Sequence, residues 1–317
     1  MAVTEADLER ELAGVAAAAA GRTGGVFGPA SMIWRVDREA AIFLGAGRAL
    51  LLQLAHPWVA AAIAEHSQSL ADPIGRFHRT FHPVFAMVFG TTAEAVGAAR
   101  RLHRRHSMIV GTLSESAGDF AAGSAYQAND VAALRWVHAS LVESALLAYQ
   151  LVLPPLGSVD RERYWAEART LASLFGIPQA LLPQSWAGFE RYIAAMLDSR
   201  QLVASRAACA IASRLLAGGG AGWRVPVWYR GLTAALLPQR LRQEFALPDA
   251  ATQGRATERV LGVLRTLYPL IPTGLRHVAP YQEARARLSG RRRPGATTRL
   301  LNRLWIGHGS IADPPAR

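Results

Sequence analysis

Helix-forming residues dominate this chain, and sequence signals for strands are scarce. Alanine, leucine and arginine recur through most of its 317 residues, and proline or glycine punctuates them. These three residue types have high intrinsic helix propensities. Apolar residues make up 51% of the chain and charged residues 18%, which suffices for a sizeable buried core. We therefore predict an all-α fold, with a single large helical domain of globin-like or bundle-like packing.

Start and stop signals place the first helices. Thr4–Ala20 has an N-terminal capping residue followed by acids, which predicts a helix that the glycine-rich segment 21–31 ends. A long apolar helix, Ala40–Ala55, is expected to end or kink at Pro57. Asp72 and Pro73 begin a helix that runs towards Phe89, with Pro83 as a candidate break.

Later signals continue the same pattern. A helix over Ala93–Val110 carries His103 and His106, and we expect Gly111 to end it as a C-terminal glycine. Asp130 is the expected cap of an apolar helix that stops at Pro154. The glycine patch 218–222 is the one clear linker-like break. We predict one domain in three parts: an N-terminal helix and Gly-rich loop (1–30), a helical core (31–245), and a C-terminal helix and basic tail packed on the same domain (246–317).

The net charge of +12 raises the question of nucleic-acid binding, but all 35 basic residues are arginine, a bias typical of a GC-rich genome. The dense basic runs are 100–105 and 285–293, and neither is interleaved with the aromatic residues on which bases stack. We expect no nucleic-acid partner.

The chain lacks the signals of secretion and of membrane insertion. Cys209 is the one cysteine, which excludes an intramolecular disulfide and suits a reducing compartment. The acid-rich start is unlike a secretory leader. The segment 40–64 is long enough to span a bilayer, but Arg48, Gln53, His56 and Pro57 fall in its middle. We expect no transmembrane segment and a soluble, cytoplasmic protein.

Histidines gather in the first half of the chain, whereas the glycine-rich nucleotide loops, the GxSxG motif and the HExxH motif are absent. Histidine is the commonest metal ligand, and helical bundles build cofactor sites from facing helices. His78 and His82 could share a helical face as a two-histidine metal site, but no Glu-x-x-His pattern supports it. For each histidine, an ordinary structural hydrogen bond is the alternative. Seven of the nine histidines lie within 83 residues: His56, His66, His78, His82, His103, His106 and His138.

An ordered set of short motifs resembles the bacterial DUF2236, or MpaB-like, oxygenase family, which includes the rubber oxygenases. The resemblance covers roughly residues 30–245. It rests on Trp34 with Glu39, Gly47–Leu51 with Gln53, His56 and Pro57, Glu65–Ser67, Arg76, Arg79, Thr80, Phe89, Gly90, His106 with Gly111, Tyr126, Ala128, Asp130, Trp136–His138, Phe175, Gly176, Pro178, Leu182, Pro183 and Trp186.

The resemblance implies a non-covalent haem b and an oxygenase-like core that surrounds a haem pocket. It makes His106 the iron ligand and makes Arg76, Arg79 and Thr80 the segment over the haem that takes part in oxygen chemistry. Rubber oxygenases have a lysine where this chain has Arg79, and arginine is a poor iron ligand but a good hydrogen-bond donor. The family's acidic residue has no clear counterpart, and Glu65 and Glu143 are candidates by location.

The resemblance implies a haem-dependent oxygenase that uses dioxygen on a hydrophobic, isoprenoid or lipid-like substrate, with oxidative cleavage of a carbon–carbon double bond as the expected reaction. Alternatives remain open. Arg76 and Arg79 are equally consistent with binding haem propionates, and Thr80 with a buried hydroxyl. His66 is a candidate for lining the pocket, whereas His56 and His138 are better explained as structural. A non-catalytic haem or gas-sensing protein and a metal-free helical carrier of an apolar ligand are the competing functions.

Overall fold

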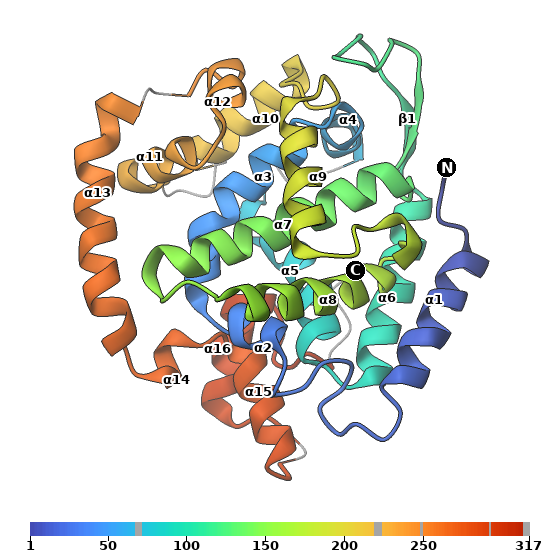
Figure 1. Cartoon of the computed structure of the whole chain (residues 1–317), viewed down its shortest axis with the longest axis vertical. Helices are drawn as coiled ribbons and strands as arrows, with labels where there is room; N and C mark the ends of the chain where they lie inside the picture. Colours follow the sequence, from blue (N-terminus) through green and yellow to red (C-terminus); the bar gives the residue numbers. More distant parts are fainter. Residues whose placement is uncertain (67–71, 219–223, 248–249, 292, 313–317) are drawn as a thin grey trace.

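The computed structural model describes residues 1–66, 72–218, 224–247, 250–291 and 293–312, and these form an all-helical domain with one small sheet (Figure 1). The α-helices are α1 (Glu5–Ala18), α2 (Met32–Asp37), α3 (Ala46–Leu54), α4 (Pro57–His66), α5 (Pro73–Phe89), α6 (Thr92–Ser107), α7 (Val131–Val152), α8 (Ser158–Ser173), α9 (Trp186–Asp198), α10 (Arg206–Ala217), α11 (Val227–Ala235), α12 (Gln239–Glu244), α13 (Ala250–Leu267), α14 (Thr273–Arg276), α15 (Ala279–Leu288) and α16 (Ala296–Ile306). The 3-10 helices are η1 (Ala40–Gly45), η3 (Gln179–Leu181) and η4 (Tyr268–Leu270), and the antiparallel strands are β1 (Val110–Thr112) and β2 (Ala125–Gln127). The predicted all-α class and the single domain are confirmed.

α7 crosses the middle of the molecule, and the other helices pack around it (Figure 1). Asp130 starts this helix as predicted, because its carboxylate accepts the backbone N–H groups of Ala132 (2.9 Å) and Ala133 (3.1 Å). Among the described residues it is the one helix long and apolar enough to cross a membrane, and 61% of its most apolar window is buried inside the protein. Core helices also have this composition.

The segment 40–66 passes the same test of length and composition, but its two halves meet at an angle of 99°. The bend falls where Pro57 begins α4, as the sequence predicts. The first half is itself divided into η1 and α3 rather than forming one α-helix from residue 40. The bend turns the chain back into the domain, so that both halves pack on neighbouring helices.

One hydrophobic cluster runs from Val3 to Ile311 and includes members from both ends of the chain. Buried tryptophans link its helices. The indole N–H of Trp34 donates to the carbonyl of Val88 (2.7 Å), and that of Trp136 donates to the carbonyl of Leu52 (2.8 Å). A buried indole that finds a partner combines a large apolar surface with a satisfied polar atom. These two motif residues are therefore core residues that fix the contacts between helices.

Two predicted element boundaries are wrong. α5 continues through Pro83, which lacks only its own backbone hydrogen bond to the preceding turn while the helix remains packed on both sides. α6 ends at Ser107, and Gly111 lies in β1 rather than at the end of the helix. A Cβ atom at Gly111 would lie 2.5 Å from the phenol oxygen of Tyr126, so this position requires glycine for space. The glycine patch at 218–222 falls mostly outside the described residues, although Gly218 ends α10 with a φ of 108°.

The segment predicted as a C-terminal helix and basic tail contains several helices. α15 and α16 pack against α5 and against each other. The buried carboxylate of Glu283 accepts hydrogen bonds from Asn302 (2.6 Å), Ser310 (2.5 Å) and the backbone of Ile311 (3.1 Å). This segment is therefore anchored by buried polar contacts as well as by apolar packing.

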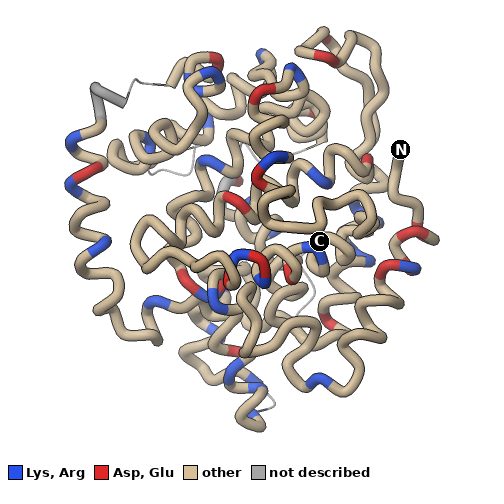
Figure 2. Tube along the Cα trace, viewed as in Figure 1, with Lys and Arg blue, Asp and Glu red and all other residues tan. Residues whose placement is uncertain are grey.

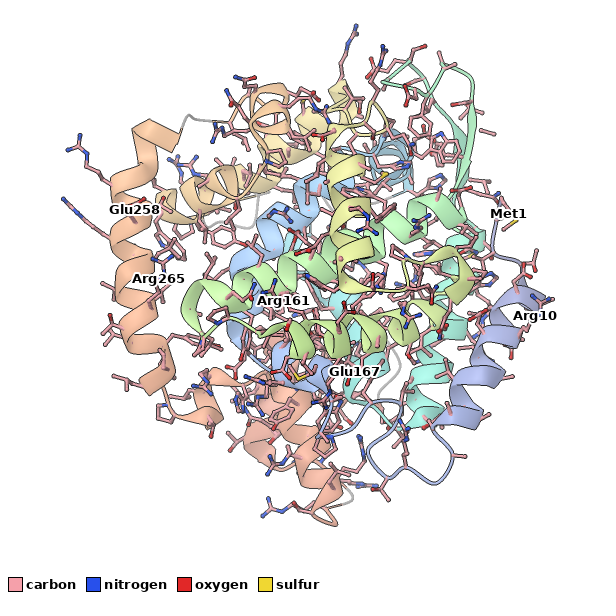
Figure 3. The ribbon with its side chains drawn as sticks, viewed as in Figure 1. Met1, Arg10, Arg161, Glu167, Glu258 and Arg265 are labelled. Carbon is pink, nitrogen blue, oxygen red and sulfur yellow. The ribbon has the colours of Figure 1, made fainter. Side chains whose placement is uncertain are left out.

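Charged residues cover the outside of the domain. Figure 2 shows the arginines spread over most helices rather than gathered on one. α13 and α1 form opposite edges of the view in Figure 3, where Glu258 and Arg265 lie on α13 and Arg10 on α1. The guanidinium of Arg265 donates to the carbonyl of Leu151 (3.0 Å) and so ties α13 to the end of α7.

Candidate active site: an apolar cavity and a histidine cluster

A cavity of about 620 Å³ lies between α3, α5, α7, α10, α11 and α16. This volume is typical of sites for small organic ligands. Its walls are mainly apolar, and Ile74 and Leu304 line it although they are 53% and 68% exposed. These two exposed residues place the opening of the cavity between the first turn of α5 and α16.

Aromatic rings form one wall. The ring of Phe43 lies 4.9 Å from that of Phe81, 5.2 Å from that of Phe77 and 5.0 Å from that of Trp305, measured between centroids. These edge-on and tilted contacts are the favourable arrangements for aromatic pairs. Because α5 presents Phe77 and Phe81 one turn apart on the same face, the wall continues along this helix.

Glycines shape another wall, and a buried ion pair lies behind it. A Cβ atom at Gly47 would lie 2.3 Å from the hydroxyl of Thr233, so glycine at this position permits α3 to approach α11. Arg48 is 4% exposed, donates to the hydroxyl of Ser144 (2.8 Å) and forms an ion pair with Glu143. Burial raises the pKa of Glu143, and the charge of Arg48 opposes this shift. Glu143 is thus engaged by a buried cation rather than facing the cavity.

Arg76 and Thr80 contribute polar atoms to the cavity. They are four residues apart on α5, so they lie on one face of the helix and border the same space. Burial lowers the pKa of Arg76, and the neighbouring charge of Arg79 lowers it further. An arginine in this setting retains its charge and its planar set of donors.

Arg79 lies on another face of α5. Its guanidinium forms an ion pair with Asp72 (3.2 Å), and its side chain is 45% exposed. It does not line the cavity. The structure therefore brings together Arg76 and Thr80, and separates them from the third residue of the predicted segment.

His106 lies near the end of α6, half-buried and outside the lining of the cavity. Burial lowers the pKa of His106 to about 4, with help from the charges of Arg105 and His103, while a hydrogen bond with the Asn129 side chain acts in the opposite direction. Asn129 is itself held, because its amide N–H donates to the carbonyl of His103 (3.1 Å). The Asn129 side chain therefore lies beside His106 at the end of α6.

Further polar residues surround the end of α6, and we call this group, with His106 and Asn129, the hairpin cluster. The phenol of Tyr126 donates to the carboxylate of Glu65 (2.6 Å), and Nε2 of His66 lies 3.0 Å from the carbonyl oxygen of Val110. Burial and the Glu65 carboxylate raise the pKa of Tyr126. His66 is thus held by the backbone of β1 and is not part of the cavity wall.

The remaining histidines have structural contacts. His78 borders the cavity and its Nε2 lies 2.9 Å from the carbonyl oxygen of Leu304, while the ring of His82 lies 5.3 Å from that of His308. His138 is buried, and its Nε2 lies 2.8 Å from the carbonyl oxygen of Ala168, which links α7 to α8. Within the residues that the structure describes, no group of three or more His, Cys, Asp or Glu side chains is arranged to hold a metal ion.

A haem differs from a bare ion because it requires only one axial side chain from the protein. His106 is the candidate for this side chain, and it does not line the cavity of about 620 Å³. Its lowered pKa keeps the ring neutral near pH 7, which is the form that binds iron, and the Asn129 side chain lies beside the ring. A neutral histidine near the end of α6 is the observation on which a haem ligand at this position depends.

Several cavity residues were not predicted. Leu215, Tyr229 and Trp305 come from α10, α11 and α16, all distant in sequence from the histidine-rich half. Tyr229 donates to the carbonyl of Phe43 (2.8 Å) and accepts from the backbone of Gly47 (3.0 Å). Apolar periodicity in these helices predicts a buried face, but it carries no signal for which buried face borders a cavity.

A family model described as "ER-bound oxygenase mpaB/B'/Rubber oxygenase, catalytic domain" matches residues 34–266. The chain belongs to this family. The recognition made from the motifs is confirmed, and an oxygenase-type activity follows from the family. No curated protein and no solved structure was found to match the chain. The matched region contains Arg76, Thr80 and His106, whereas the wall residues Leu304 and Trp305 lie beyond it.

Proposed function

We propose that this member of the family is a haem-dependent oxygenase that acts on a hydrophobic, isoprenoid or lipid-like substrate with dioxygen. The observation that carries the proposal is the cavity of about 620 Å³, whose apolar and aromatic walls contain the polar pair Arg76 and Thr80. An apolar pocket with a few converging polar groups is the usual form of a site for a small organic substrate.

The substrate side of the proposal follows from the walls of the cavity. Phe43, Phe77, Phe81 and Trp305 offer ring faces and edges to an unsaturated chain. Burial of such a chain releases water from apolar surface, which supplies most of the affinity for a ligand that has few polar atoms. The same walls exclude water from the reacting carbon atoms.

His106 is the residue proposed to hold the haem, and the Asn129 side chain lies beside its ring. Haem, when bound, supplies the redox chemistry that dioxygen requires. Arg76 has two candidate roles, as an ion-pair partner of a haem propionate or as a hydrogen-bond donor towards dioxygen. Thr80, one turn further along α5, offers a hydroxyl donor on the same face.

The decisive experiment is an absorption spectrum of the purified chain, titrated with hemin, followed by dioxygen consumption with a panel of prenyl and unsaturated lipids. We expect a strong Soret band that is lost in His106→Ala and retained in His103→Gln. His103 is a matched control, since it lies one turn earlier on α6 and contacts the carbonyl of Val3. A preparation that stays colourless after addition of hemin would contradict the proposal.

One alternative has specific support, since His106 does not line the cavity. A metal-free carrier would bind an apolar ligand in the cavity and use the histidines only as structural residues. Tight binding of an unsaturated lipid by a chain that takes up no haem would favour this carrier. Haem uptake without dioxygen consumption on any lipid of the panel would favour a non-catalytic haem or gas-sensing protein, although a cavity of substrate size argues against it.

A further inference from the structure

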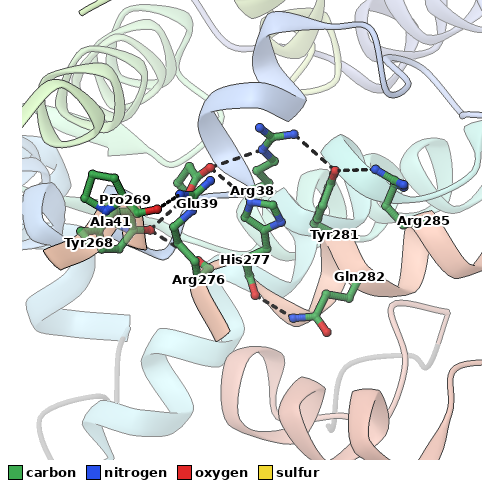
Figure 4. Close-up of polar contacts among 10 residues, drawn as sticks. All are labelled: Arg38, Glu39, Ala41, Tyr268, Pro269, Arg276, His277, Tyr281, Gln282 and Arg285. Atoms are coloured by element: carbon green, nitrogen blue, oxygen red, sulfur yellow. Dashed lines mark hydrogen bonds and ion pairs between the residues drawn. The ribbon is translucent and has the colours of Figure 1, made fainter. Parts of the chain in front are cut away.

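A second pocket, of about 420 Å³, lies where the end of α2 meets α14 and α15 (Figure 4). Its lining is polar and basic, in contrast to the apolar cavity. It consists of Arg38, Thr273, Gly274, Arg276, His277, Tyr281, Gln282 and Arg285.

The walls of this pocket carry three guanidinium groups and no carboxylate. The nearest acid, Glu39, is 1% exposed and lies behind the wall. Its carboxylate lies 2.9 Å from Nε of Arg276, 3.3 Å from Nε2 of His277 and 3.4 Å from Nε of Arg38. Burial raises the pKa of Glu39, but the close approach of His277 and the charge of Arg276 outweigh it and leave the pKa below its usual value.

Two of the guanidinium groups converge on one neutral atom. Nη1 of Arg38 and Nη1 of Arg285 lie 3.4 Å and 3.2 Å from the phenol oxygen of Tyr281 (Figure 4). Like charges that approach the same neutral acceptor repel each other, and each guanidinium has further donors to offer. Within the described part of the chain, no carboxylate forms an ion pair with Arg285. The arrangement is suited to an anion between the two arginines.

The backbone around the pocket is fixed. The side-chain amide of Gln282 donates to the carbonyls of Gly274 (2.9 Å) and His277 (2.8 Å). The backbone N–H of Val278 donates to the carbonyl of Arg38 (2.8 Å), next to the bridge between Glu39 and His277. The arginines are therefore presented by a preformed frame, which lowers the entropic cost of binding.

We propose that this pocket binds a small phosphate-bearing anion, a phosphate monoester or a diphosphate, between Arg38, Arg276 and Arg285. Glu39 offsets one of the three guanidinium charges, and the two that remain match the charge of about −2 that a phosphate monoester carries at neutral pH. Guanidinium groups match phosphate oxygens in geometry as well as in charge. The site is separate from the apolar cavity, and it stands whether or not the chain binds haem.

The test uses the full chain and inorganic phosphate, pyrophosphate, malonate and sodium chloride at matched ionic strength. We expect phosphate and pyrophosphate to raise the melting temperature saturably, and calorimetry to show binding of pyrophosphate. Arg285→Gln should weaken this binding about tenfold, the loss expected for one charged hydrogen-bonding partner. Arg285 is exposed and distant from the buried Glu39 contacts, so its variant should fold normally.

Arg299→Gln is the matched control. It removes the same charge from an exposed position on α16, outside the pocket, and should bind pyrophosphate like the unchanged chain. Equal stabilisation by phosphate and chloride would overturn the proposal, as would equal loss of binding in the two variants. Tighter binding of malonate than of pyrophosphate would overturn the assignment of the ligand as a phosphate.

Discussion

The apolar cavity and the hairpin cluster are built in opposite ways. The cavity is formed by side chains from η1 and six α-helices that lie between residues 40 and 306, and apolar contacts hold it together. The hairpin cluster is formed at the end of one helix and a short sheet, and hydrogen bonds such as that between Tyr126 and Glu65 hold it together. A cavity built from apolar walls tolerates ligands of varied shape, whereas a hydrogen-bonded cluster fixes individual side chains in orientation.

Under the proposed function, the two regions have different tasks. His106 is proposed to bind the cofactor, and the aromatic walls are proposed to bind a variable apolar substrate. If the proposal is right, the apolar walls and the hairpin cluster can be damaged independently, whereas Arg76, which is proposed to contact haem or dioxygen, affects both tasks. Variants of the hairpin cluster should affect the cofactor first, and variants of the cavity should affect the substrate first.

The largest expected effect is that of His106→Ala on haem binding. Loss of an outer-shell partner weakens cofactor or metal binding about 10- to 100-fold, and loss of the ligand itself should exceed this. The measurement is hemin titration followed by the Soret band. The same variant should still bind an apolar fluorescent probe in the cavity with unchanged affinity. Loss of probe binding along with haem would show that the two regions form one unit.

The second largest effect is expected on the rate of dioxygen consumption, when either of two arginines on α5 is replaced. Arg76→Gln should lower the rate of dioxygen consumption about 10- to 100-fold, because a charged hydrogen bond contributes about 1.5–3 kcal/mol. Arg79→Gln should leave the rate nearly unchanged, since Arg79 is exposed, paired with Asp72 and outside the cavity. The opposite ranking would instead support the role for Arg79 that the family resemblance implies.

These comparisons also show how far the sequence alone reaches. Caps and stops are local, so the starts of α1 and α7 at Thr4 and Asp130 could be predicted. The hairpin of β1 and β2 could not, since strands of three residues carry no usable periodicity. This hairpin also explains why the prediction for Gly111 was wrong. Gly111 lies in β1, where a side chain would collide with Tyr126, and it does not end a helix.

The sequence predicts some residues of the candidate site and misses others. The motif residues Arg76, Thr80 and His106 could be named, but the orientation of Arg79 away from the cavity depends on its ion pair with Asp72. Trp305 lay in a segment predicted as a basic tail, and its contact with Phe43 joins residues separated by most of the chain. Such contacts arise from tertiary packing and leave no local signal.

The third effect concerns Trp305 at the cavity wall. Trp305→Leu should weaken the binding of a lipid that fills the cavity about tenfold and shift preference towards bulkier chains, because it removes one aromatic face. Leu300→Ala on the exposed side of α16 is the control, with Leu300 65% exposed. Competition binding with lipids of increasing size measures both. Haem binding should be the same in the two variants, and a loss of haem in Trp305→Leu would contradict the separation of tasks.

The smallest expected effect is a pH dependence of the free energy of unfolding, caused by a buried histidine near the hairpin of β1 and β2. His56 is buried at the bend between α3 and α4, and its ring lies 5.1 Å from that of Phe120, in the loop between β1 and β2. Burial lowers the pKa of His56 to about 4. As the pH falls below about 6.5, the unfolded chain takes up this proton first, so the free energy of unfolding decreases until the pH approaches 4.

Between about pH 7.5 and about pH 5.5 this proton should cost about 1 kcal/mol of stability. In His56→Gln that part of the pH dependence should disappear, whereas His66→Gln, at an exposed ring on the same side of the domain, should keep it. Urea unfolding of the haem-free chain at the two pH values measures the difference. An unchanged pH dependence in His56→Gln would mean that His56 is hydrated. In that case the bend between α3 and α4 would be open to water. The side chains near the hairpin would then not be held in fixed orientations, and the contrast with the cavity would fail.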